Sequence, residues 1–174
     1  MRWVGFLILL AIVAVLQSTV VSWIRIQRIG PDLVFLLALF YLLHAEPLDA
    51  LIAAWLAGLA LDLFSEVRLG TFAFSFGLVG LALVRLRQLV FRDHPVTQLF
   101  LALVGCELIQ VVARSVTAVL EPRLSWSPTD VLLGALYTAL YTAVLAPYVL
   151  WLMLRLRGLL GLRTPSRLRP RRNA

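Results

Sequence analysis

The amino-acid sequence predicts an all-α polytopic membrane protein folded as a compact bundle of six transmembrane helices. Of the 174 residues, 61% are hydrophobic and 14% are charged, whereas a soluble domain is about 45–50% apolar and about 25% charged. The apolar residues form six segments, to be compared with the ~20 residues that a helix needs to cross a bilayer. These segments are Trp3–Trp23, Pro31–Ala45, Pro47–Phe64, Leu69–Val84, Pro95–Leu120 and Pro128–Leu154.

The whole chain divides into a transmembrane domain over residues 1–162 and a basic tail over 163–174, which we expect to be disordered. The first apolar segment lacks a signal-peptide cleavage site and is expected to be a retained span. The net charge of +7 is carried by loops and tail, so it indicates orientation in the membrane rather than binding to nucleic acid. Cys106 is a lone cysteine, which excludes an intramolecular disulfide.

The second segment is the shortest, at about 22 Å of helix. We expect it either to be buried among its neighbours or to thin the membrane locally. Four segments, the second included, begin with proline, which suits the first position of a helix. Glu46-Pro47 separates the second and third segments into a hairpin.

The distribution of arginines along the sequence predicts the orientation of the chain in the membrane. With six spans, one side of the membrane collects Arg2, Arg85, Arg87, Arg92 and the arginines of the tail. The other side holds Arg25, Arg28, Arg68 and Arg123, offset by Asp62, Glu66, Glu121 and Asp130. Because basic loops remain inside, both termini are predicted to be cytoplasmic.

The third segment carries a strip of small residues, Ala50, Ala54 and Gly58, spaced four apart and followed on the same face by Asp62. Such strips let membrane helices approach closely. We therefore expect another helix, from this chain or from a partner, to pack against Gly58. A carboxylate at the end of a packing face and before a tight turn is an unusual combination, and its simplest interpretation is that Asp62 reaches interfacial water.

The fifth segment carries Glu107, Gln110, Arg114 and Thr117 on one face. Ionisable groups at membrane depth generally face inward and find partners, which favours an internal polar clasp over a proton or ligand site. Asp62 and Arg114 fall at a similar depth, so we predict a direct or water-bridged contact between them, with Glu107 as the weaker candidate. Asp62, Glu107, Gln110 and Arg114 then form an intramembrane polar cluster.

Polar residues also end the first segment, where Gln17, Ser18, Thr19 and Ser22 lie toward the same side as Asp62. They either line a shallow polar pocket or mark the membrane interface. The sequence holds no Ser–His or Cys–His set, paired metal ligands, phosphate loop or dinucleotide fingerprint. We therefore expect a protein that is not an enzyme and that uses no cofactor or metal.

One pattern resembles a known family. Gly58, Asp62-Leu63, Ser65 and Leu69-Gly70, preceded by Pro31-Asp32-Leu33, are similar to the motif of the rod shape-determining membrane protein MreD. The chain departs from that motif at Glu66, where glycine is common, so the turn after Ser65 is expected to differ in backbone geometry.

The resemblance implies a non-catalytic subunit of the cell-elongation machinery in the bacterial inner membrane. It implies docking of an MreC-like single-span protein and, through it, the MreB filament and the peptidoglycan glycosyltransferase and transpeptidase. The residues assigned to helix packing or partner binding are Ala50, Ala54, Gly58, Asp62, Ser65, Leu69 and Gly70. One alternative is the substrate-binding subunit of a vitamin-type uptake transporter, which a six-helix bundle of this size resembles. A proton-coupled channel would rest on Glu107 and Arg114 alone.

Overall fold

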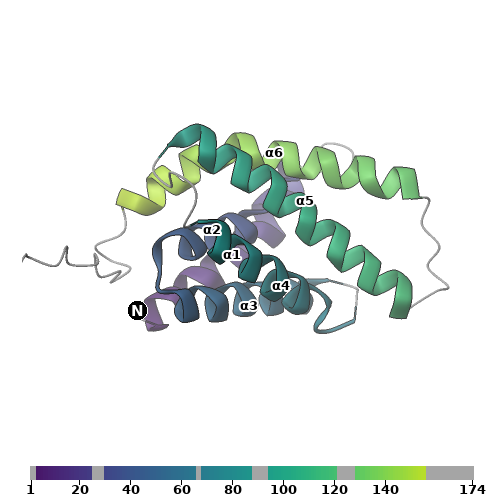
Figure 1. Cartoon of the computed structure of the whole chain (residues 1–174), viewed down its shortest axis with the longest axis horizontal. Helices are drawn as coiled ribbons and strands as arrows, with labels where there is room; N and C mark the ends of the chain where they lie inside the picture. The colour runs from purple at the N-terminus through teal and green to yellow at the C-terminus, as the bar shows by residue number, and fades with distance from the viewer. Residues whose placement is uncertain (1–2, 25–29, 66–67, 88–93, 121–127, 156–174) are drawn as a thin grey trace, which may run out of the picture.

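The computed structural model is all-helical, as predicted, and describes residues 3–24, 30–65, 68–87, 94–120 and 128–155, with side chains for all of these except 20–24, 95 and 128–132. Its described part contains six helices (Figure 1). They are α1 (Trp3–Ile24), α2 (Leu33–His44), α3 (Pro47–Phe64), α4 (Thr71–Leu86), α5 (Pro95–Leu120) and α6 (Pro128–Arg155).

Three helices are long and apolar enough to cross a membrane, namely α3, α5 over Val96–Leu120 and α6 over Leu133–Arg155. Helices α2 and α4 are shorter, with 12 and 16 residues. Helix α1 has 22 residues, but its described side chains cover only Trp3–Thr19, which ranks it with the shorter apolar helices. A crossing by all six helices therefore remains a prediction.

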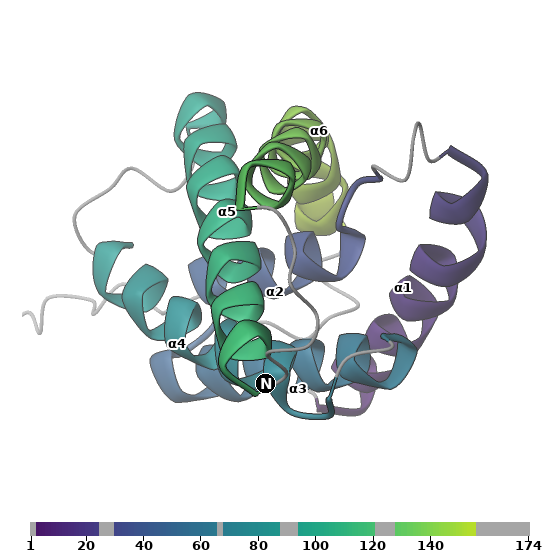
Figure 2. The same ribbon diagram turned by 90° about the vertical axis from the view of Figure 1, so that its right-hand side faces the viewer.

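Helix α2 lies at the centre of the bundle and contacts each of the other five helices (Figure 2). Every residue from Val34 to Leu43 is at most 2% exposed. Of the two outcomes expected for this short segment, burial among its neighbours is the one observed. Such an apolar helix is stabilised here by helices on all sides rather than by lipid.

Charged side chains cap both ends of α2. At its start Asp32 is the N-cap residue and its Oδ1 accepts a hydrogen bond from the Phe35 amide (2.9 Å). At its end the Arg87 guanidinium donates to the carbonyl oxygens of Leu42 and Ala45 (2.6 and 2.8 Å). The expectation that this segment begins at Pro31 is wrong, because Asp32 provides the cap and the helix begins at Leu33.

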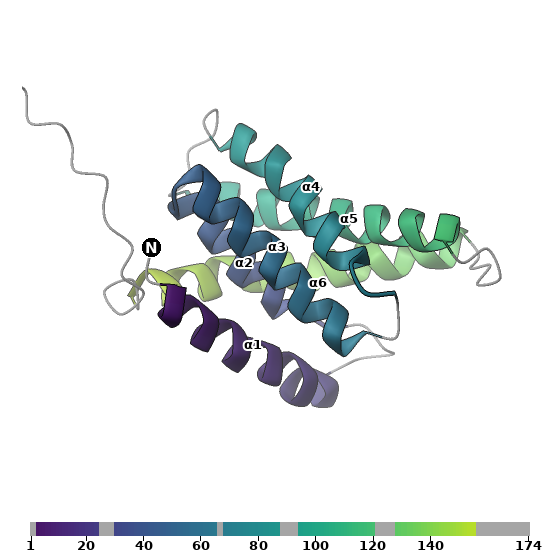
Figure 3. The ribbon, with the colours of Figure 1, turned by 90° about the horizontal axis from the view of Figure 1, so that it is seen from below.

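Two helical hairpins and the single helix α1 surround α2. Helices α3 and α4 form one hairpin, and α5 and α6 form a second that lies along one side of the molecule (Figure 1). Helix α1 packs on α2 and α3 at the edge of the molecule opposite α4 (Figure 3).

Several sequence-based expectations concern residues outside the described part of the chain. They are the basic tail over 163–174, the departure at Glu66 and the loop arginines Arg2, Arg25, Arg28, Arg92 and Arg123. The predicted orientation, which depends on these arginines, stays a prediction.

Candidate functional site

The Asp62 carboxylate binds the first turn of α4. Its side chain is only 2% exposed. Oδ2 accepts hydrogen bonds from the amides of Gly70 (3.0 Å) and Ala73 (2.9 Å), and Oδ1 accepts one from Phe72 (2.9 Å). The first amides of a helix have no partner within it and carry partial positive charge, so a carboxylate there is stabilising. Asp62 thus joins the end of α3 to the start of α4.

The turn between the two helices makes this geometry possible. Ser65 ends α3, and both its amide and its hydroxyl donate to the Asp62 carbonyl (3.3 and 3.2 Å). Gly70 then adopts a φ of +100° as the N-cap residue of α4, a conformation that favours glycine. This is why α4 begins at Thr71 rather than at Leu69, and Leu69 is an exposed turn residue.

The small-residue strip of α3 packs against α4 of the same chain. A Cβ atom added to Gly58 would lie 2.6 Å from the Phe72 carbonyl oxygen and 2.7 Å from the Ala73 Cα. Ala54 lies against Gly80 of α4, and Ala50 and Ala54 are fully buried. Helix α4 is therefore the helix that approaches closely, and the strip is covered within the chain.

Of the four residues expected to form an intramembrane polar cluster, Glu107 and Arg114 interact with each other, whereas Asp62 lies in a separate environment. Among the described residues, all hydrogen bonds and ion pairs of the Asp62 carboxylate are with the α4 backbone. The prediction of a direct contact between Asp62 and Arg114 is therefore wrong, and its water-bridged form stays a prediction. Arg114 interacts electrostatically with Glu107, two turns earlier on α5. Thr117 donates to the carbonyl of Ala113 on its own helix (2.9 Å).

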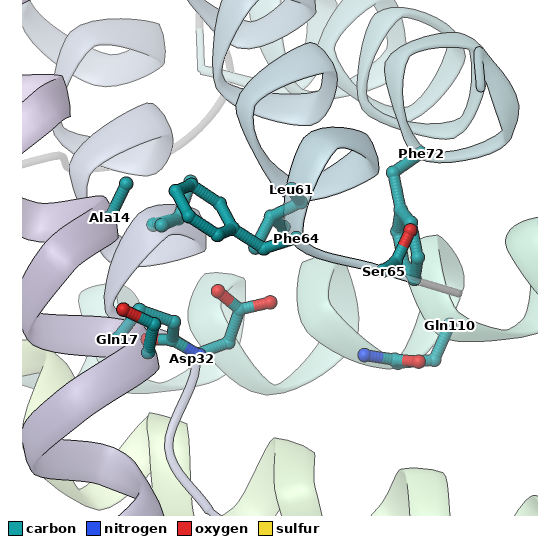
Figure 4. A pocket seen from close by; sticks show the side chains of 10 residues that line it. Ala14, Gln17, Asp32, Leu61, Phe64, Ser65, Phe72 and Gln110 are labelled. Atoms are coloured by element: carbon teal, nitrogen blue, oxygen red, sulfur yellow. The ribbon is translucent and has the colours of Figure 1, made fainter. Parts of the chain in front are cut away.

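A pocket of about 370 Å³ lies beside this junction, where α1, α3 and α5 meet above the start of α2 (Figure 4). It is lined by Ala14, Gln17, Ser18, Asp32, Val34, Leu61, Phe64, Ser65, Phe72 and Gln110. The polar pocket considered from the sequence thus exists and includes Gln17 and Ser18. Thr19 and Asp62 are not among its lining residues, and the Ser22 side chain lies outside the described part of the chain.

Gln17 and Thr142 fix the segment that positions Asp32. The Gln17 amide donates to the Pro31 carbonyl (3.2 Å) and accepts from the Leu33 amide (2.8 Å). The Asp32 amide donates to the Thr142 hydroxyl on α6 (2.9 Å). Asp32 is thus held between α1 and α6 with its side chain 6% exposed. Sequence reasoning missed Asp32 as a site residue, although an aspartate directly before an apolar run is an N-cap signal.

The two segments that carry the family resemblance meet at this pocket. Asp32 comes from the first segment, and Ser65 comes from the second. The family model for the rod shape-determining protein MreD matches residues 1–157. No curated protein and no solved structure matches the chain.

Proposed function

The chain belongs to the MreD family of rod shape-determining proteins, and from that premise we propose that it is a non-catalytic membrane subunit of the bacterial cell-elongation machinery. Its role in shape determination follows from the family. The observation that carries the proposal is the family match over residues 1–157, nearly the whole chain. The three long apolar helices support an integral membrane location.

The partner we propose is an MreC-like single-span protein, which would link the subunit to the MreB filament and to the peptidoglycan glycosyltransferase and transpeptidase. The small-residue strip of α3 is buried against α4, so we place the docking surface on the outward faces of the helices. Many large apolar side chains lie on those faces, including Val4 and Ile8 of α1. A single apolar partner helix can pack on such a surface in lipid.

We further propose that residues 1–162 form one domain of six spans in the inner membrane, with both termini and the 163–174 tail in the cytoplasm. Arginine asymmetry supports this orientation. Reporter fusions placed at Ala174 and after Glu66 test it, because six spans put these positions on opposite sides of the membrane. Reporters on the same side would contradict the six-span topology.

Partner recovery is the direct test of function. We expect a tagged chain, extracted from native membranes, to bring down an MreC-like protein identified by mass spectrometry. We also expect deletion of the gene for this chain to abolish the rod shape of the cell. Recovery of a transporter ATPase in place of the MreC-like protein would favour the uptake-transporter alternative instead.

A further inference from the structure

The pocket above the start of α2 has the size and the mixed lining of a small-molecule site. Its volume of about 370 Å³ falls in the range of about 300–1,000 Å³ that such sites occupy. One half of the lining is apolar, contributed mainly by Leu61, Phe64 and Phe72, and the other half is polar. A ligand here would therefore combine an apolar body with a polar group.

Among the residues that the structure describes, Asp32 is the only charged one that lines the pocket. Hydrogen bonds from the amides of Phe35 and Val34 use two of the roughly four acceptor positions of its carboxylate. Figure 4 shows this carboxylate in the pocket, between Gln17 and Gln110. A buried carboxylate without a counter-charge is unfavourable, and the partial charge at the start of α2 offsets only part of that penalty. A bound cation would offset the remainder.

Gln110 lies across the pocket from Asp32 (Figure 4). Its side-chain amide makes no hydrogen bond to other described residues, so its oxygen can accept from a ligand. Gln17, by contrast, uses both amide atoms on the backbone before α2. The nearest arginine along α5, Arg114, is not among the lining residues and interacts with Glu107. The lining therefore favours a cation over an anion.

We propose that this pocket binds the primary ammonium group of a small amphipathic amine. The Asp32 carboxylate and the Gln110 oxygen accept hydrogen bonds from the ammonium, and the apolar body lies against Leu61, Phe64 and Phe72. A free amine and the headgroup of an aminolipid present the same chemistry. This site is independent of partner docking, so its test stands whether or not an MreC-like protein is recovered.

Calorimetric titration of the detergent-purified full chain tests the proposal. The probes are n-butylammonium and two molecules of similar size, 1-butanol and butyrate. We expect only the ammonium to bind. Asp32→Asn should weaken its binding about tenfold or more, because a charge-assisted hydrogen bond is lost. Asparagine caps a helix as well as aspartate does, so this variant should keep the fold.

Two further variants complete the test. Glu46→Gln removes the same charge from an exposed residue just after the opposite end of α2 and should leave binding unchanged. Gln110→Leu removes the other acceptor without affecting the α2 cap, and it should also weaken binding. The proposal is overturned if the ammonium does not bind the parent protein, if butanol binds equally well, or if both pocket variants bind as the parent does.

Binding experiments in lipid vesicles distinguish a free amine from the headgroup of an aminolipid as the source of the ammonium group. In phosphatidylcholine vesicles the reconstituted protein should bind n-butylammonium. Loss of that binding when phosphatidylethanolamine is added, with recovery at excess n-butylammonium, would assign the site to the lipid headgroup. Unchanged binding would assign it to a free amine. Absence of binding in both vesicle types would overturn the proposal.

Discussion

Two buried aspartates, Asp62 and Asp32, lie at the starts of two helices and have different amounts of hydrogen-bonding capacity left. Asp62 accepts three amides of the α4 start with its two oxygens. Asp32 accepts the amides of Phe35 (2.9 Å) and Val34 at the start of α2, and it faces a pocket. The comparison teaches that burial of a carboxylate does not by itself indicate a binding site. What matters is the acceptor capacity that the local backbone leaves unused.

The surroundings of the two residues differ in the same way. The α3–α4 junction is closed, because Gly58 lets the α4 backbone lie directly on α3. The region around Asp32 is open, since the described part of α1 packs on α2 and α3 and a pocket lies between α1 and α5. The closed junction should control stability, and the open one should be tolerant of change. Four substitutions test this difference.

Removal of the Asp62 carboxylate should have the largest effect. Asp62→Ala leaves one buried and two partly buried amides without this acceptor. At about 1–3 kcal/mol for each lost partner, the free energy of unfolding should fall by about 4 kcal/mol. Asp62→Asn keeps one acceptor oxygen and should fall between the parent and the alanine variant. Thermal unfolding in detergent measures the series. Equal stability of Asp62→Ala and the parent would show that the junction does not depend on this carboxylate.

A methyl group at Gly58 should separate α3 from α4. Gly58→Ala places Cβ 2.6 Å from a backbone oxygen, and the resulting shift should lower the free energy of unfolding by about 2–3 kcal/mol. Gly77→Ala is the matched control, because its Cβ would meet Trp55 at an ordinary 3.6 Å. The free energy of unfolding of that variant should rise by about 0.5–1 kcal/mol, because a glycine inside a helix is replaced by alanine. Similar unfolding temperatures for both variants would contradict the close packing at Gly58.

Loss of the Arg87 cap should have a smaller effect. Arg87→Met keeps much of the side-chain volume but leaves the carbonyls of Leu42 and Ala45 without this donor. We therefore expect the free energy of unfolding to fall by about 1–2 kcal/mol. Arg85→Met changes the same charge at an exposed position of α4 and should be nearly neutral. If Arg85→Met destabilises as much as Arg87→Met, the effect is one of charge and not of capping.

Neutralisation of Asp32 should change stability least. Asparagine retains the N-cap hydrogen bond, so Asp32→Asn should change the free energy of unfolding by less than about 1 kcal/mol. Asp32→Ala removes the cap and should lower the free energy of unfolding by about 1 kcal/mol. Unfolding measured side by side with the Asp62 pair gives the comparison directly. A loss for Asp32→Asn as large as that for Asp62→Asn would remove the distinction between the two aspartates.

The helices could be predicted from the sequence because apolar runs and prolines carry their signals locally. Pro47, Pro95 and Pro128 each stand at the first position of a helix, as expected. The start of α4 was placed two residues early, since only the backbone conformation of Gly70 shows that the turn extends through it. The family resemblance, carried by a short motif, is confirmed by the match over residues 1–157.

The contacts of the polar residues could not be predicted, because they depend on how each helix is rotated about its axis. Matched depth suggested that Asp62 would meet Arg114, but depth does not specify which face of α3 points toward α5. The amides of Phe72 and Ala73 were the stronger competitors for the carboxylate, and no local sequence signal links them to Asp62. Asp32 differed in that its N-cap signal was visible in the sequence.

The short, capped helix α2 has a consequence for how the chain enters the membrane. Its 12 residues rise about 18 Å, well short of the hydrocarbon thickness of about 30 Å. Alone in lipid, during synthesis, such a segment would not hold a transmembrane position. It reaches its place only when α3, joined to it through Ala45 and Glu46, is available, and its C-terminal carbonyls gain the Arg87 donor only after α4 has been made. We therefore expect α2 to reach its final place at the centre of the bundle only after α3 and α4 have been made.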